Sequence, residues 1–391
     1  MVDQRRRRRR QKRKVDTVKD LIERIKNQLG GTPLSEVGKR LLRTIELLQY
    51  SPERDGLWPK IDHSFSNFLS HLPDRFGPRF HFDAYLLHSI KEEWGQGPAS
   101  FPDTVVPVYR REWQYVPLPV PGETEGGKAH HLYLIGIDEA EEHRYDSPPW
   151  LLDYPLVCHE LAHYLLAKYG HSFKEEFEAS LENVLRDRAK RRLPLRGQSA
   201  SVSESLSDDL AQHWSIDERG HWAFEIAVDV IALWACGPAY LETLTHHLSK
   251  YQNKFQIEPS HPSAALRADA LLLATERLQW SDYTSNLQDT RDDWFEEGPP
   301  SFNRYNALTD EKLVRACIDS VLPYCKEMKL PQLRPNDLTR IQNRVEKDQE
   351  LVGTDLIVGA WIVEQNCTNE EYEVWQASRY DKYVAALDDG E

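Results

Sequence analysis

The sequence predicts a mainly helical α+β fold with one small sheet near residues 104–137. Apolar residues recur at intervals of three and four along most of the chain, which is typical of helices that bury one face. The strongest strand signal is the run from His131 to Ile137. As an edge strand this run would hold an extended peptide by main-chain hydrogen bonds, and otherwise it is purely structural. Helical regions are expected on both sides of the sheet.

The composition is that of a globular protein with a sizeable core. The chain has 391 residues, of which 40% are hydrophobic and 29% charged. It has no apolar run long enough for a membrane span, and its first residues lack the apolar segment of a secretory signal. The five cysteines are an odd number without a CxxC pair, which suits a reducing compartment and argues against a cysteine-held zinc. We therefore expect a soluble, cytoplasmic protein without a membrane span.

Charge is distributed unevenly along the chain. Residues 1–14 carry nine Lys and Arg against one Asp, a net charge of +8, which leaves −22 for the remainder because the whole chain has −14. A block of like charges repels itself, so we expect this tail to be disordered. Residues 5–14 are candidates for binding an anionic partner, nucleic acid or an acidic protein, and a solvated tail is the alternative. The acidic remainder is not typical of a protein that binds nucleic acid in a groove.

The domain organisation predicted from these patterns has four parts. They are a basic disordered tail at 1–14, an N-terminal helical region at 15–100, a central domain at 101–280 and a C-terminal helical region at 281–391. The last part carries no chemical motif.

The most informative stretch is an apolar helical run, 155–166, that contains His-Glu-x-x-His. Pro155 suits a first helical turn, and Asp153 is a candidate cap. His159 and His163 lie four residues apart, so they share a helix face and can bind one ion through neutral ring nitrogens. Glu160 would then lie beside a metal-bound water, where a general base belongs. The apolar neighbours predict burial, and buried histidines and acids need partners.

A second apolar helix is predicted at 222–234, and it contains two acids, Glu225 and Asp229, on one face. Two like charges in a buried stripe are costly unless a cation or a histidine compensates them. Glu225 is therefore the candidate third zinc ligand. Asp229 is the candidate acceptor for the second ring N–H of a ligating histidine. The alternative is that both acids pair with arginines elsewhere.

A third helix is expected to open after His261-Pro262 and to carry Arg267. His261 and Arg267 are candidates for charge stabilisation at the site. Taken alone, they would be a cap region and a surface arginine.

Three motifs together resemble the M48-type metallopeptidases, gluzincins related to the CAAX prenyl peptidase and heat-shock protease families. They are the HExxH of His159 to His163, the ExxxD of Glu225 to Asp229 and the HPxxxxR of His261 to Arg267. The resemblance covers residues 130–280. It implies a zincin-like core and a zinc-dependent endopeptidase acting on a peptide or protein substrate.

The resemblance also implies roles for the residues. One zinc ion per chain would be held by His159, His163 and Glu225, and no other cofactor is implied. Glu160 would activate a zinc-bound water, and His261 and Arg267 would stabilise the oxyanion, as catalytic residues. Asp229 would accept a hydrogen bond from the second ring N–H of a histidine that binds the zinc.

Other assignments fit the sequence less well. His171 is a weaker candidate for the third ligand, because it lies beyond the expected end of the helix. A metzincin would need glycine and histidine where the chain has Leu166 and Tyr169. The alternative functions are a catalytically silent interaction protein that keeps a zinc site, and a protease that the arginine tail recruits to nucleic acid.

Overall fold

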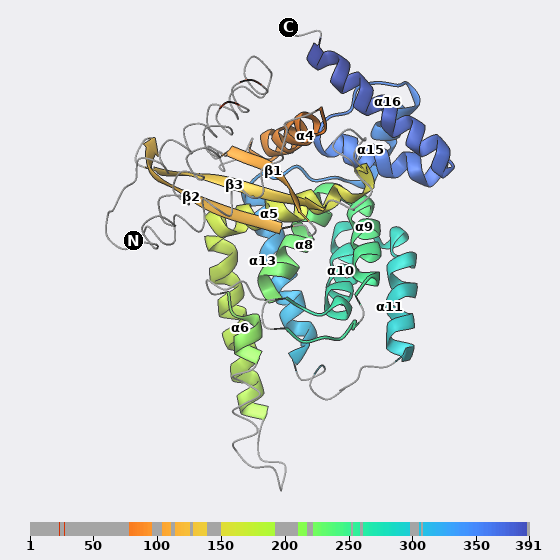
Figure 1. Cartoon of the computed structure of the whole chain (residues 1–391). Coiled ribbons are helices and arrows are strands. Elements are labelled where there is room, and N and C mark those ends of the chain that lie inside the picture. Colours follow the sequence, from red (N-terminus) through yellow and green to blue (C-terminus); the bar gives the residue numbers. More distant parts are fainter. Residues whose placement is uncertain are drawn as a thin grey trace, which may run out of the picture. The chain divides into compact units, whose positions relative to one another are not determined.

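The structure is a computed structural model of the chain, and it confirms that the protein is mainly helical (Figure 1). It describes residues 23, 27, 78–95, 104–110, 114–125, 128–138, 150–191, 210–216, 222–251, 253–258, 261–297, 305 and 308–388. The basic tail at 1–14 and nearly all of 15–77 lie outside the described residues, so the expectations for them stay predictions.

The chain divides into two compact units. The sheet unit takes its described residues from Met1–Lys91, Phe101–Trp150 and Cys367–Glu391, and the helical unit takes them from Glu92–Ser100 and Leu151–Asn366. The domain predicted at 101–280 is therefore divided between them. All three metallopeptidase-like motifs lie in the helical unit, together with most of the region predicted as a separate C-terminal part.

The sheet unit contains three strands in the order β1-β3-β2. The middle strand β3 (Lys128–Asp138) pairs in parallel with β1 (Thr104–Arg110) and antiparallel with β2 (Gln114–Glu125). The run predicted as the strongest strand thus has a neighbour on each side, which excludes it as an edge strand that holds a peptide. Within β2, Pro117 and Pro119 lie opposite Tyr133 and His131. Neither proline has a backbone N–H, and the two missing donors are on the same side of β2. Prolines in a strand are usual at the edge of a sheet.

The helices of the sheet unit are α16 (Asn369–Asp388) and most of α4 (Pro78–Trp94). Aromatic rings join them: the ring of Tyr383 packs against Phe82 and Tyr85, with centroids 5.3 and 4.9 Å apart. The Tyr383 hydroxyl donates to the carbonyl of His81 at 3.0 Å. The aromatic residues of this region are therefore packing residues.

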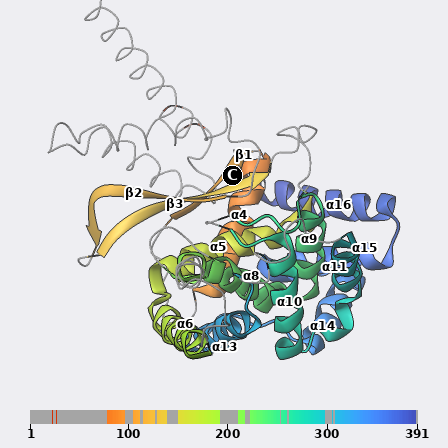
Figure 2. The same ribbon diagram turned by 90° about the horizontal axis from the view of Figure 1, so that it is seen from below.

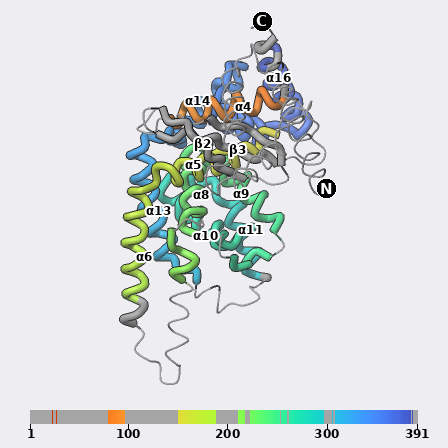
Figure 3. The backbone as a smooth tube through the Cα atoms, turned by 60° about the vertical axis from the view of Figure 1, so that its left-hand side comes forward, coloured from red at the N-terminus to blue at the C-terminus, as the bar shows by residue number. Residues whose placement is uncertain are grey.

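In the helical unit, α8 (Trp222–Cys236) lies among the other helices (Figures 1 and 2). It contacts α5 (Pro155–Tyr169), α9 (Pro238–Ser249), α10 (Ala264–Leu278), α13 (Glu311–Glu327) and α15 (Gly353–Asn366). Nearly all of α8 is buried, including its two acids, because it is apolar on all sides. The remaining elements are α6 (His171–Arg191), α11 (Ser285–Glu297), α14 (Pro335–Glu346) and the short 3₁₀ helices Leu151–Asp153 and Ser281–Tyr283. Helix α6 runs along α13 (Figure 3).

Local sequence explains where these helices start and stop. Pro155 begins α5 as predicted, but the cap expected at Asp153 is wrong. Asp153 ends a 3₁₀ turn, and the residue at the cap is Tyr154, whose side chain makes no capping hydrogen bond. Ser263 caps the start of helix α10, where its side chain accepts a hydrogen bond from the backbone N–H of Leu266 at 3.2 Å. None of the helices in the described part of the chain combines the length and apolar composition that crossing a bilayer requires.

Candidate metal centre

Helix α5 presents the HExxH residues together on one part of its surface. One donor atom from each of His159, Glu160 and His163 lies within 4.8 Å of the others. The Nε2 atoms of the two histidines are 3.2 Å apart, and their rings meet edge to face. His159 and Glu160 are each only 6% exposed. The spacing of four on a helix thus brings the two ring nitrogens together, as the sequence predicts.

Helix α8 supplies the third candidate ligand. Glu225 places Oε2 3.7 Å from Nε2 of His159 and Oε1 3.6 Å from Nε2 of His163. Ligands about 2.0–2.1 Å from a tetrahedral zinc are about 3.3 Å from one another. The three separations, 3.2, 3.6 and 3.7 Å, are near that edge length. The donor set of two imidazoles and one carboxylate therefore fits zinc in both chemistry and spacing.

Asp229, one turn further along α8, lies behind His159. Its Oδ1 is 2.9 Å from Nδ1 of His159, on the opposite side of the ring from Glu225. Arg267 of α10 binds the same carboxylate with two nitrogens, Nε at 2.8 Å and a terminal nitrogen at 2.6 Å. Asp229 therefore has both of the partners that the sequence offered as alternatives, a histidine and an arginine.

Tyr240 of α9 belongs to the same group of side chains, although no sequence pattern singles it out. Its hydroxyl donates to Oδ1 of Asp229 at 2.5 Å and lies 3.1 Å from Nδ1 of His159. The side chain is fully buried. A buried tyrosine is usually a core residue whose hydroxyl finds one partner, so only the packing of α9 on α8 reveals this role.

The electrostatics of the cluster favour a neutral His163 beside charged acids. Burial lowers the pKa of His163 to about 4, against the opposing charge of Glu225. Burial also disfavours the charged carboxylates, but the nearby charges of His163 and His159 bring the pKa of Glu225 below its ordinary value. Against the same burial, the Arg267 guanidinium and the hydrogen bond to His159 hold the pKa of Asp229 well below its usual range. His163 is thus neutral near pH 7, the form of histidine that binds metals.

His159 differs from His163 because of its acid partner. Burial acts to lower its pKa, but the hydrogen bond and the charge of Asp229 raise the pKa above the ordinary value for histidine. An acid that accepts from one ring N–H leaves the other nitrogen as the electron-pair donor. Nε2 faces His163 and Glu225, so it is the nitrogen of His159 that would coordinate a metal.

The two remaining predicted site residues have different surroundings. The side chain of His261 is 60% exposed, and its Nε2 lies 3.8 Å from Oε1 of Glu225. Arg267 is 7% exposed, and its guanidinium binds the carboxylate of Asp229, the acid that lies behind His159. His171 begins α6, is 84% exposed and lies 3.1 Å from Glu175. It is not part of the donor cluster.

A thiol next to the motif adds nothing to the chemistry. Cys158 is fully buried, 3.3 Å from the sulfur of Cys236. Burial raises its pKa well above the ordinary value, so a thiolate is disfavoured.

No family model, curated protein or solved structure matches the chain. The class of the protein therefore has to come from the chemistry of this site.

Proposed function

We propose that the chain is a zinc-dependent endopeptidase of the M48-like gluzincin class, with α5 and α8 as the centre of a zincin-like core. The observation that carries the proposal is the convergence of His159, His163 and Glu225 at 3.2–3.7 Å, with an intact Glu160 beside them. A structural zinc site needs no general base, and it normally closes all four positions with side chains. Three ligands and a neighbouring glutamate are typical of a catalytic site.

Each of these residues has a separate role in peptide hydrolysis. A zinc ion held by the three ligands supplies a Lewis acid for the scissile carbonyl. Glu160 accepts the proton of the attacking water and passes it to the leaving amine. His261, on the exposed side of Glu225, is placed to donate to the negative oxygen that develops on the carbonyl.

Asp229, Tyr240 and Arg267 have a positioning role in this scheme. Asp229 holds Nδ1 of His159, and the other two side chains hold Asp229. Arg267 is therefore not assigned the contact with substrate that the sequence suggested. It holds Asp229, which in turn holds the ligand His159. Second partners of this kind fix the ring orientation and raise the basicity of the ligand.

The decisive experiment compares the full chain with Glu160→Gln. Both proteins are expected to carry one zinc per chain, measured by elemental analysis. Only the wild type should generate new peptide N-termini from a proteome-derived peptide library, because an amide cannot take the proton of water. Glu276→Gln, an exposed acid on α10, is the matched control and should cleave like the wild type.

The same experiment separates the alternatives. Zinc bound in full with identical N-termini for wild type and Glu160→Gln would exclude an enzyme and leave the silent zinc-site interaction protein. A preparation that binds no zinc would remove the proposal altogether.

A further inference from the structure

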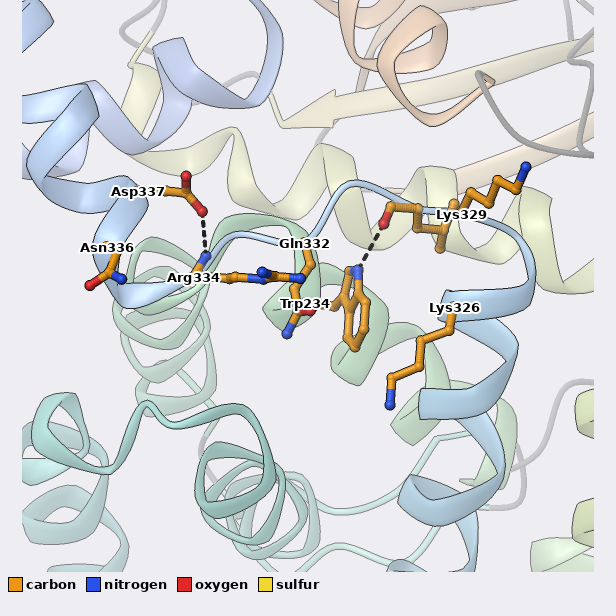
Figure 4. A pocket seen from close by; sticks show the side chains of 8 residues that line it. Trp234, Lys326, Lys329, Gln332, Arg334, Asn336 and Asp337 are labelled. Atoms are coloured by element: carbon orange, nitrogen blue, oxygen red, sulfur yellow. Dashed lines mark hydrogen bonds between the residues drawn. The ribbon is translucent and has the colours of Figure 1, made fainter.

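A cavity of the helical unit lies away from the candidate metal centre, where the chain passes from α13 to α14 beside the end of α8 (Figure 4). Its volume is about 680 Å³. It is lined by Trp234, Lys326, Lys329, Leu330, Gln332, Arg334, Asn336 and Asp337. Three of these side chains are cationic and one is anionic, so the lining has a net charge of +2 in a chain whose net charge is −14. An acidic protein therefore has a local basic site here.

The walls of this cavity are held by hydrogen bonds. The backbone carbonyl of Trp234 accepts from the N–H of Leu333 at 3.0 Å, and its indole N–H donates to the carbonyl of Leu330 at 3.1 Å. The indole ring is thus held in place as a flat wall of the cavity, and its N–H group is already hydrogen-bonded (Figure 4). The backbone and the ring of Trp234 are therefore both hydrogen-bonded to the segment that joins α13 to α14.

The single carboxylate of the lining is already engaged. Asp337 accepts a hydrogen bond from the backbone N–H of Arg334 at 3.0 Å, at the start of α14 (Figure 4). Its other oxygen lies 3.7 Å from the guanidinium of Arg340. It therefore does not neutralise the cations of the cavity.

Arg334 differs from most arginines in the described part of the chain. Seven of them lie within 4.0 Å of a carboxylate: Arg79, Arg267, Arg277, Arg291, Arg315, Arg340 and Arg344. Among the described residues, neither Arg334 nor Lys326 has such an ion pair. Figure 4 shows the Arg334 guanidinium beside Gln332 on one side of the Trp234 indole and the Lys326 ammonium on the other side. Two cations that have no carboxylate partner in the described part of the chain therefore flank one aromatic wall.

We propose that this cavity binds the phosphate group of a small molecule through Arg334 and Lys326. A planar guanidinium matches two phosphate oxygens, and a lysine adds a compact charge. The carboxamides of Gln332 and Asn336 supply neutral donors, and the indole of Trp234 packs against the rest of the molecule. The volume lies in the range of small-ligand sites, about 300–1,000 Å³. This site is independent of the metal centre and goes beyond the proposed peptidase activity.

The experiment measures binding of pyrophosphate and of ATP to the full chain by calorimetry. Hydrogen–deuterium exchange of residues 326–340 locates the binding, because the basic tail at 5–14 also attracts anions. Both probes are expected to slow exchange in this segment, and added salt should weaken their binding. Equal affinities for pyrophosphate and ATP would identify phosphate itself as the ligand. Tighter binding of ATP than of pyrophosphate would identify a nucleotide.

Point variants test the assignment of residues. Arg334→Gln and Lys326→Gln should each weaken the site roughly tenfold, because each removes a charged hydrogen-bond donor. Both side chains are exposed, so neither variant should disturb folding. Lys312→Gln, an exposed lysine at the other end of α13, is the control and should bind like the wild type. Unchanged exchange at 326–340 with saturating pyrophosphate, or full protection in the double variant of Arg334 and Lys326, would overturn the proposal.

Discussion

His159 is fixed at both of its ring nitrogens. Nδ1 faces Asp229 at 2.9 Å and the Tyr240 hydroxyl at 3.1 Å, while Nε2 faces His163 at 3.2 Å. An acceptor at Nδ1 selects the tautomer whose Nε2 carries the lone pair. The ring is therefore set in orientation and in protonation before any ligand arrives, which is the condition for a strong metal site.

Tyr240→Phe tests this arrangement at the level of one oxygen atom. The change removes the hydroxyl that contacts Asp229 and His159 but keeps the buried ring. Zinc affinity is expected to fall about tenfold, at the lower end of the usual cost of losing such a supporting contact. A competition titration against a chromophoric chelator measures it. Tyr251→Phe, at a side chain that is 49% exposed, should have the affinity of the wild type. A lower melting temperature with no change in zinc affinity would reduce Tyr240 to a packing residue.

The pH dependence of the metal-free protein follows from His163. Its pKa falls from 6.5 to about 4 on burial, so the unfolded chain binds more protons between these values. A proton bound only by the unfolded state favours unfolding. The contribution of this residue to stability is therefore complete above about pH 6.5 and is lost as the pH falls toward about 4. At 1.36 kcal/mol per pKa unit, the loss is at most roughly 3 kcal/mol.

Urea unfolding of the metal-free protein between pH 4 and 7 measures this loss. His163→Gln should flatten the decline in the free energy of unfolding, because glutamine does not titrate. His171→Gln, which changes an exposed histidine, should decline like the wild type. If both variants decline equally, His163 does not carry the effect.

At the scale of elements, α8 and α9 are joined by a single residue with a glycine conformation. Gly237 has φ 53° and ψ −131°, a region that residues with a side chain rarely adopt. A Cβ atom there would lie 2.8 Å from Cδ2 of Leu333 and 2.9 Å from Cζ2 of Trp280. This tight turn brings Tyr240 of α9 back to Asp229 of α8.

Gly237→Ala should therefore destabilise the protein through both backbone strain and crowding. Each cause costs about 1–3 kcal/mol, so a loss of roughly 2–6 kcal/mol is expected. Chemical unfolding measures the change. Lys250→Ala, at the exposed end of α9, should change stability by less than about 0.5 kcal/mol. Wild-type stability in Gly237→Ala would show that the turn relaxes freely.

The elements that carry the ligands could be predicted from the sequence, and their mutual packing could not. Helical spacing places His159 with His163, and Glu225 with Asp229, because residues four apart share a face. Those local rules gave α5 and α8 together with the candidate ligands. The double contact of Arg267 with Asp229 depends on how α10 lies against α8, a long-range contact that periodicity does not encode.

At the scale of the whole molecule, the proposed zinc ion ties two helices together. Its ligands come from α5 and α8, which also pack against each other. An ion that binds only the folded state stabilises it by about 4 kcal/mol at a thousand times its dissociation constant. Removing zinc with a chelator should therefore lower the melting temperature by several degrees. In calorimetry, Glu225→Ala should melt at one temperature with or without the chelator. A zinc-loaded wild type that melts unchanged after zinc removal would contradict this.

The order in which the chain is synthesised determines when the contacts around Asp229 can form. A ribosome makes the chain from its N-terminus, so His159 and His163 emerge long before Arg267, the last residue to join Asp229. At about 5–20 residues per second, the histidines wait roughly 5–20 s for that arginine. In the first part of this interval Asp229 has not yet been made, and in the rest it lacks its guanidinium partner, so the nascent chain holds only part of the support for His159. Loading of metal in the cell is therefore expected to follow release of α10 from the ribosome.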